Sequence, residues 1–206
     1  MELRQRALEV LCLCDPIQKA IAVMQMHQQA AQFAIAPCAP ALVSGIELPG
    51  HPERPALLRH SEVARRSPAT LQGRIILMHA IAHIEFNAIN LALDAIWRFD
   101  DMPAQYYLDW LQVAGEEGKH FLLIRDWLLA QSHDYGDFPA HQGLWIMCEK
   151  RHKMSQHVWP LCPERSKRAA WMPHRRSKPS CVRLAHPMLY LPLISLTSSC
   201  AKKWDM

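Results

Sequence analysis

The sequence predicts an all-α protein, and three observations lead to that prediction. The chain of 206 residues is 50% hydrophobic and contains only 7 Gly, a composition typical of packed helices rather than of turn-rich β-structure. Two long segments, about 70–98 and 103–132, repeat apolar residues with the 3.6-residue period of helices that face a core. A short turn that ends in Pro103 separates them, so we expect an antiparallel helical hairpin.

Two shorter segments precede this hairpin. Residues 1–33 are expected to form a pair of N-terminal helices, and Asp15-Pro16 is expected to start the second of them. Residues 34–69 contain six prolines. A proline-rich segment of this length usually lies on the surface of a domain, so we expect an extended linker here.

The region of the hairpin is predicted to span 70–152. After the second long helix, a loop at 135–143 precedes a third helix that starts near Leu144. The character of the sequence changes after His152, and residues 153–206 show no sustained helical period. Prolines recur too often there for long helices, so we treat this part as an irregular tail.

Glu85 lies in the middle of the apolar face of the first long helix. The residues at helical offsets from it are all apolar: Met78, Ile81, Ala82, Ala88, Ile89, Ala92 and Ile96. A carboxylate in such surroundings is costly unless something pairs with it, and a metal ion is a common partner.

Glu117 and His120 occupy a similar position on the second long helix. They share its predicted buried face with five apolar residues: Trp110, Val113, Phe121, Ile124 and Leu128. They are three residues apart, so both side chains project from the same face. Glu85 lies 16 residues before Asp101 and Glu117 lies 16 residues after it, which brings the two glutamates to the same height in a hairpin. We therefore predict a metal site formed by Glu85, Glu117 and His120. The spacing also allows a simpler interpretation, in which Glu116 and Glu117 lie on a solvated face.

Three runs of sequence resemble a bacterial family of ferritin-like proteins of unknown function, which is distantly similar to the diiron tRNA hydroxylases. The runs are residues 77–85, 116–121 and 135–141, and the resemblance covers about 45–152. It implies a four-helix bundle in which two helices each give one Glu and two others each give a Glu-x-x-His, together holding two metal ions. By this resemblance, Glu85 is the ligand of the first helix, and Glu117 and His120 are the pair of the second.

The chain departs from this pattern because no second hairpin with the remaining ligands follows. Residues 150–206 hold 12 Lys and Arg against 2 acidic residues, whereas residues 1–149 hold 11 against 17. We interpret the abrupt change as a shift of the reading frame just after His152, which would make residues 153–206 out-of-frame sequence. The bundle would then be truncated to one hairpin plus the N-terminal helices.

Two other pairs have spacings found in metal sites. His79 and His83 are four apart, but they lie more than 100° around the helix from Glu85. We expect them to form a hydrogen-bonded polar seam or to support the ligands. Glu149 and His152 repeat the Glu-x-x-His spacing beside the predicted break, and we interpret that match as chance.

The remaining predictions concern function and location. The cofactor is expected to be iron or manganese, and dinuclear only if a second pair of helices is supplied, for example by a homodimer. A diiron oxidase or oxygenase, a metal-free helical interaction module and nucleic-acid binding through the basic tail all remain open. No signal peptide, Cys-x-x-Cys pair or apolar stretch of membrane-spanning length is evident, so we expect a reduced, cytoplasmic protein without a membrane segment.

Overall fold

The computed structural model describes residues 1–36, 43–45, 47–59, 62 and 67–146. The helices in this part are α1 (Leu3–Leu11), α2 (Pro16–Gln28), the short 3₁₀ helix η1 (Ala30–Gln32), α3 (Leu71–Arg98) and α4 (Ala104–Ala130). The described residues contain no strand, and their only β-type pairings are two isolated bridges. The predicted all-α fold class is therefore confirmed.

The helices begin where their capping residues place them. The side chain of Asp15 accepts hydrogen bonds from the backbone N–H groups of Ile17 and Gln18, both at 2.8 Å, and Pro16 occupies the first position of α2. Thr70 Oγ1 accepts from the N–H of Gly73 at 3.0 Å. Each cap pairs backbone donors that have no partner within the helix, which fixes the starts of α2 and α3.

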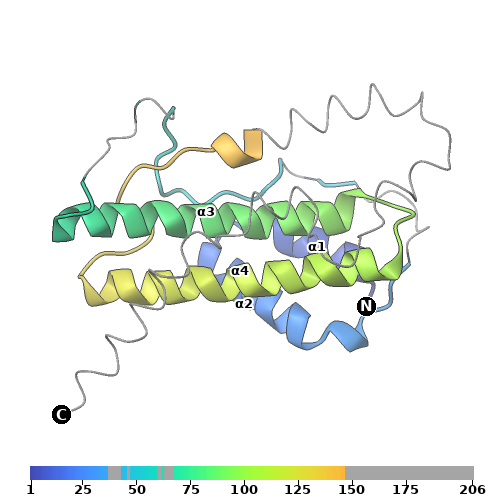
Figure 1. Ribbon diagram of the computed structural model, residues 1–206. Helices are drawn as coiled ribbons and strands as arrows, with labels where there is room; N and C mark the ends of the chain where they lie inside the picture. Colours follow the sequence, from blue (N-terminus) through green and yellow to red (C-terminus); the bar gives the residue numbers. More distant parts are fainter. Residues whose placement is uncertain (37–42, 46, 60–61, 63–66, 147–206) are drawn as a thin grey trace, which may run out of the picture. The chain divides into compact units, whose positions relative to one another are not determined.

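α3 and α4 form the predicted antiparallel hairpin and run side by side over nearly their whole length (Figure 1). The turn between them places Asp101 in the left-handed region, with φ of 52°. Tyr107, in the first turn of α4, donates its hydroxyl proton to the carbonyl of Phe99 at 2.9 Å and accepts from the N–H of Met102 at 3.3 Å. The buried tyrosine thus pairs backbone groups of the turn and holds the hairpin closed.

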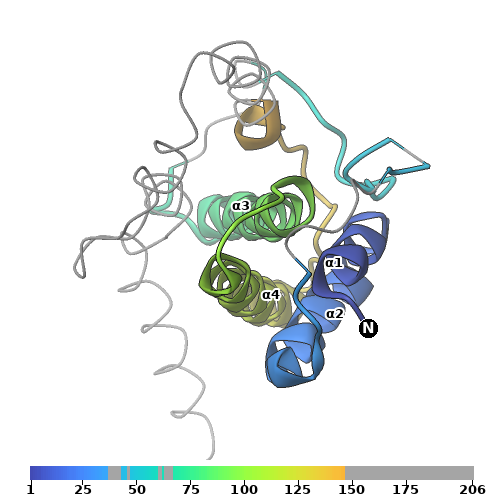
Figure 2. The same cartoon turned by 90° about the vertical axis from the view of Figure 1, so that its right-hand side faces the viewer.

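The N-terminal helices pack on one side of this hairpin, as the end-on view shows (Figure 2). α1 contacts α3, and α2 contacts mainly α4. Arg4 on α1 is buried and donates hydrogen bonds from Nε and Nη2 to the carbonyl of Trp97, at 3.3 and 3.2 Å. Because this carbonyl belongs to the last turn of α3, the contact joins the N-terminal helix to the end of the hairpin.

Gly115 and Gly118 allow α2 to approach α4 closely. A Cβ at Gly115 would lie 2.6 Å from Cβ of His27, and one at Gly118 would lie 2.7 Å from Cγ2 of Val23. No pair of Cβ-bearing residues could replace these two glycines without moving one helix away from the other. The two positions lie on either side of Glu117 in the sequence.

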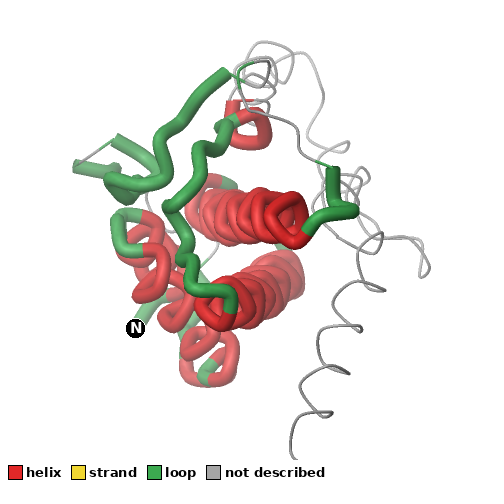
Figure 3. The backbone as a smooth tube through the Cα atoms, turned by 90° about the vertical axis from the view of Figure 1, so that its left-hand side faces the viewer, coloured by secondary structure: helices red, strands yellow, loops and turns green. Residues whose placement is uncertain are grey.

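Two irregular segments cover α3 on the side away from α4. Residues 47–59, which belong to the predicted linker, run alongside α3 in cyan in Figure 1 and are mostly exposed. The loop after α4 returns over α3, as the green tube in Figure 3 shows, and ends in a helical turn at 143–146. The third predicted helix therefore starts as expected, and its continuation lies outside the described residues.

α3 differs from the sequence-based prediction in one respect. Among the described helices, it alone has the length and apolarity of a membrane span, although no such segment was expected. In its most apolar window of 18 residues, 72% is buried inside the protein. This burial accounts for the apolarity, because the helix is covered on several sides by the rest of the fold.

Candidate metal centre

Glu85 lies on the face of α3 that is buried against the rest of the protein. All seven apolar residues predicted to flank it are buried, and Glu85 itself is 0% exposed. Helical periodicity predicted that this face of α3 is buried, and the prediction is confirmed along the whole row of seven residues.

The corresponding face of α4 is only partly as predicted. Glu117 is 2% exposed, and Phe121, Ile124 and Leu128 are buried with it. Trp110, Val113 and His120 are half-buried instead. The most buried side of α4 is shifted around the helix toward Gly115 and Gly118, because α2 packs there.

The three predicted ligands come together in space. One candidate ligand atom from each of Glu85, Glu117 and His120 lies within 4.8 Å of the other two. His120 Nδ1 is 3.0 Å from Glu117 Oε2, and the His120 side chain is 27% exposed. Since a carboxylate only accepts hydrogen bonds, this ring nitrogen donates to Glu117. The interpretation that Glu117 lies on a solvated face is excluded by its burial.

Glu85 is the unusual member of the group. Both of its carboxylate oxygens are buried without a donor from an N–H or hydroxyl group, and the polar side chain that interacts with them is a second carboxyl, that of Glu117. Burial, then a hydrogen bond with the Glu117 side chain and the charge of Glu117, raise the pKa of Glu85 from its ordinary value of 4.5 to about 10. A buried carboxyl without donors is destabilising, and such groups in native proteins call for an explanation.

A bound cation would supply what this group lacks. Two carboxylates and one imidazole on two packed helices are a ligand set that iron and manganese accept. Positive charge at this position would stabilise both carboxylates in their ionised form, which burial otherwise disfavours. The donor chemistry therefore fits a metal ion, and the described residues offer this one group of three or more ligands.

His79 and His83 lie on the other side of α3 and are hydrogen-bonded, as predicted. The N–H of Gly136 donates to His79 Nε2 at 2.9 Å. His83 Nε2 lies 3.2 Å from the carbonyl of His141, and its Nδ1 lies 2.8 Å from the hydroxyl of Tyr135. A carbonyl only accepts, so Nε2 carries the proton of neutral His83 and Tyr135 donates to Nδ1. Burial lowers the pKa of both histidines to about 4.

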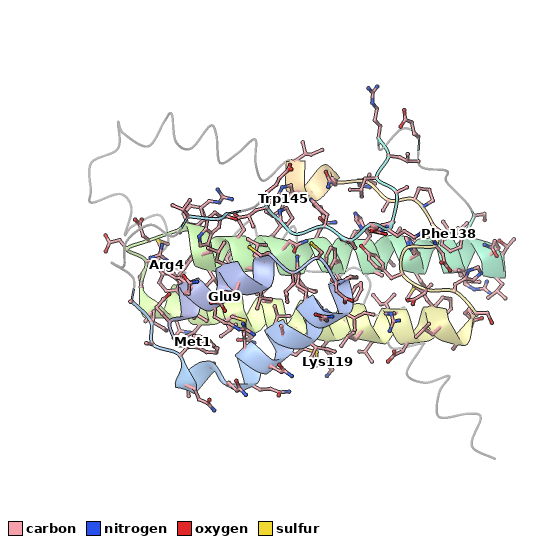
Figure 4. All side chains as sticks on the ribbon, turned by 180° about the vertical axis from the view of Figure 1, so that it is seen from behind. Met1, Arg4, Glu9, Lys119, Phe138 and Trp145 are labelled. Carbon is pink, nitrogen blue, oxygen red and sulfur yellow. The ribbon has the colours of Figure 1, made fainter. Side chains whose placement is uncertain are left out.

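The loop that carries these partners also contacts α4. Arg125 forms a two-pronged ion pair with Asp134, at 2.8 Å for both contacts. The ring of Tyr135 packs against Phe121 of α4 with centroids 5.0 Å apart, and the ring of Phe138, labelled in Figure 4, packs edge-on against His79 at 5.4 Å. The loop thus connects both helices close to the candidate ligands.

Two features of this region were not predicted from the sequence. The close packing of α2 against α4 has a signal in the spacing of Gly115 and Gly118, which share one side of a helix. The burial of Lys19 on α2, which donates to Asn90 on α3 at 2.7 Å, has none, since the two residues are 71 positions apart.

Some predictions concern residues beyond the structural description. The second Glu-x-x-His, formed by Glu149 and His152, lies outside the described residues, and so does the tail at 153–206. The suggested frame shift after His152 therefore stays a prediction.

Comparison with known proteins identifies the family. A family described as "Protein of unknown function (DUF455)" matches residues 12–164. The chain belongs to this family. The match includes all three candidate ligands as well as α2, and it is wider than the predicted resemblance over 45–152. It ends a short distance beyond the suggested break at His152, and residues 165–206 lie outside it.

A search of curated proteins found a relative of this chain. An "Uncharacterized protein" of Haemophilus influenzae (strain ATCC 51907 / DSM 11121 / KW20 / Rd) is 44% identical over 117 residues. The match covers 53% of this chain but only 41% of the relative, so the chain spans less than half the length of that protein. No solved structure matches the chain.

Proposed function

We propose that this chain is a ferritin-like metal-binding protein in which Glu85, Glu117 and His120 hold iron or manganese. The observation that carries the proposal is the Glu85 carboxyl, which is fully buried and has a second carboxyl, that of Glu117, as its hydrogen-bonding neighbour, with an imidazole beside them. A cation is favoured over a structural role because two carboxyl groups buried side by side can pair with each other only by sharing a proton, whereas a bound cation lets both be ionised.

The chain supplies three ligands, and a site for two ions of the type implied by the resemblance takes six. We propose that a second copy of the hairpin supplies the other three in a homodimer, since a two-fold axis presents the same side chains from both chains. The half-buried ring of His120 marks the side of the cluster that is still open in one chain.

When bound at Glu85, Glu117 and His120, iron would supply the chemistry of dioxygen activation, as in oxidases and oxygenases. The residues of this chain contribute the surroundings. The stripe around Glu85 excludes water, and the hydrogen bond between Glu117 and His120 orients the imidazole ring. The closed aromatic contacts of Tyr135 with Phe86 and Phe121 shield the neighbouring part of the hairpin.

Metal analysis tests the proposal directly. The purified chain is loaded anaerobically with Fe(II) or Mn(II), desalted, and its metal content is measured together with its mass in solution. We expect bound metal in the wild-type chain, and at least a tenfold weaker affinity in Glu85→Gln and His120→Ala. Glu116→Gln is the matched control, because Glu116 lies next to Glu117 but is paired with Gln112 instead. Equal metal content in all four proteins would refute the site.

Other results would support the two other functions that the sequence leaves open. A chain that binds no metal and folds normally would be a helical interaction module. Salt-dependent binding to nucleic acid that disappears when residues 150–206 are removed would assign the function to the basic tail.

The two cysteines of the described part, Cys12 and Cys14, are free thiols, which supports the proposed location in the reducing cytoplasm.

A further inference from the structure

The ammonium group of Lys19 joins three separate parts of the fold. Its side chain is 0% exposed, and Nζ donates to the carbonyl of Leu11 at 3.1 Å, to the carbonyl of Gly50 at 3.0 Å and to Asn90 Oδ1 at 2.7 Å. These acceptors belong to the end of α1, to the linker segment and to α3. An ammonium has three N–H donors, so this set of acceptors pairs all of them.

The side-chain amide of Asn90 is oriented so that its oxygen, and not its nitrogen, takes part in a hydrogen bond. Its side-chain oxygen faces Lys19, while its Nδ2 is buried without a hydrogen-bond partner. The face of the Phe86 ring lies 5.1 Å from Lys19 Nζ and closes another side of the group. The surroundings of Nζ are thus built from acceptors and a π-face, the groups that bind a cation.

Gly50 is the point where the linker enters this arrangement. Its N–H donates to the carbonyl of Leu11 at 2.9 Å, and a Cβ at this position would lie 2.3 Å from the carbonyl oxygen of Cys12. Only glycine fits so close to the end of α1. The other end of the segment is held by Leu58 and Ala56, which pair with Ala140 through backbone hydrogen bonds of 2.8 and 3.0 Å.

Between these two ends the segment crosses the side of α3 that carries His83 and Asn87. His51, Pro52, Pro55 and Leu57 form one wall of a small pocket whose opposite wall includes His83 and Phe86. Glu53 and Arg54, in the middle, are exposed. Besides the pairings at its two ends, the segment is held by the buried Pro55 and by a contact of 3.2 Å between His51 Nε2 and Gln142 Nε2. A segment held at a few such points, with exposed residues between, is the type of structure that opens locally without global unfolding.

We propose that residues 49–58 form a strap over this side of α3 and that Lys19 is the clasp that keeps its Gly50 end closed. Opening at this end exposes the pocket, while the pairing with Ala140 acts as the hinge. The three hydrogen bonds of Lys19 go to Leu11, Gly50 and Asn90 and to none of the candidate metal ligands.

Site-resolved hydrogen exchange of the full chain at pH 6, at which Lys19 carries its proton, tests the clasp. In Lys19→Met, we expect the Gly50 amide to exchange at least tenfold faster, with little change at Leu58 or at Phe121 in the middle of α4. Lys119→Met is the matched control, because Lys119 lies on the exposed side of α4 (Figure 4). Unchanged exchange at Gly50, or an equal acceleration at Gly50 and Phe121, would overturn the proposal.

A second variant keeps the test informative even where Lys19→Met fails to fold. Asn90→Asp has the same shape, places a negative charge beside the ammonium and removes the unpaired Nδ2. We expect the Gly50 amide to exchange at least threefold more slowly in this variant. Faster or equal exchange would show that Lys19 does not hold the strap.

Discussion

Gly118 on α4 and Val23 on α2 pack so closely that a Cβ at position 118 would lie 2.7 Å from Val23 Cγ2 and 2.8 Å from the carbonyl oxygen of Ala20. The second of these atoms belongs to the backbone, so a side chain at this position would displace α2 as a whole. Because Glu117 directly precedes Gly118, the contact also holds the carboxylate in its place on the buried side of α4.

Gly118→Ala is therefore expected to destabilise the protein by about 1–3 kcal/mol, the usual cost of overpacking, despite the better helix propensity of alanine. Chemical denaturation measures the change. Gly45→Ala serves as the control, because nothing lies within 4 Å of a Cβ at that position. Equal stability of the two variants would mean that α2 adjusts freely against α4.

Replacing Glu85 by leucine should make the metal-free protein more stable. The substitution removes a buried carboxyl that lies against a second carboxyl and adds apolar contacts, so we expect the free energy of unfolding to rise by about 1–3 kcal/mol. Thermal unfolding in the presence of a chelator measures the effect, with Glu116→Leu as the control. A loss of stability in Glu85→Leu would show that the carboxyl has a structural partner.

Metal binding should release protons near neutral pH. The pKa of Glu85 is raised by burial and by Glu117, so the carboxyl holds a proton that a metal ligand must lose. For the metal-free protein, the unfolded state loses this proton above its ordinary pKa of 4.5 and the folded state keeps it, so stability falls as the pH rises. Calorimetry in two buffers of different ionisation enthalpy counts the released protons, and Glu85→Gln should release fewer.

Lys19 should contribute a pH dependence of the opposite sign. Burial lowers its pKa from 10.5 to about 7, so between these values the unfolded state binds a proton that the folded state does not. Stability therefore rises with pH across this window. The unfolding free energies of wild-type and Lys19→Met, compared at pH 7 and pH 9, isolate the effect, and a constant difference between the two proteins would contradict it.

The candidate ligands were predictable because their positions depend on local rules. A helix repeats every 3.6 residues, and a short turn at Asp101 fixes which residues of α3 and α4 lie at the same height, so Glu85, Glu117 and His120 could be placed together from spacing alone. The helix starts at Asp15 and Thr70 follow from capping chemistry in the same way.

The contacts made by α2 and the linker could not be predicted in this way. Lys19 meets Asn90 across 71 positions and meets Gly50 across 31, and no periodic pattern connects such distant residues. The half-burial of Trp110 and Val113 has the same origin, because which side of α4 is covered depends on where α2 docks. Tertiary packing, and not helix periodicity, decides these features.

The position of Arg4 has a practical consequence for truncated proteins. The family match begins at residue 12, which lies after the last residue of α1. A fragment cut at that boundary would lose both hydrogen bonds from Arg4 to Trp97 and would uncover the side of α3 on which Leu3 and Ala7 are fully buried. We therefore expect a hairpin fragment that starts at residue 12 to be less soluble than one that keeps residues 1–11, which lie outside the family match.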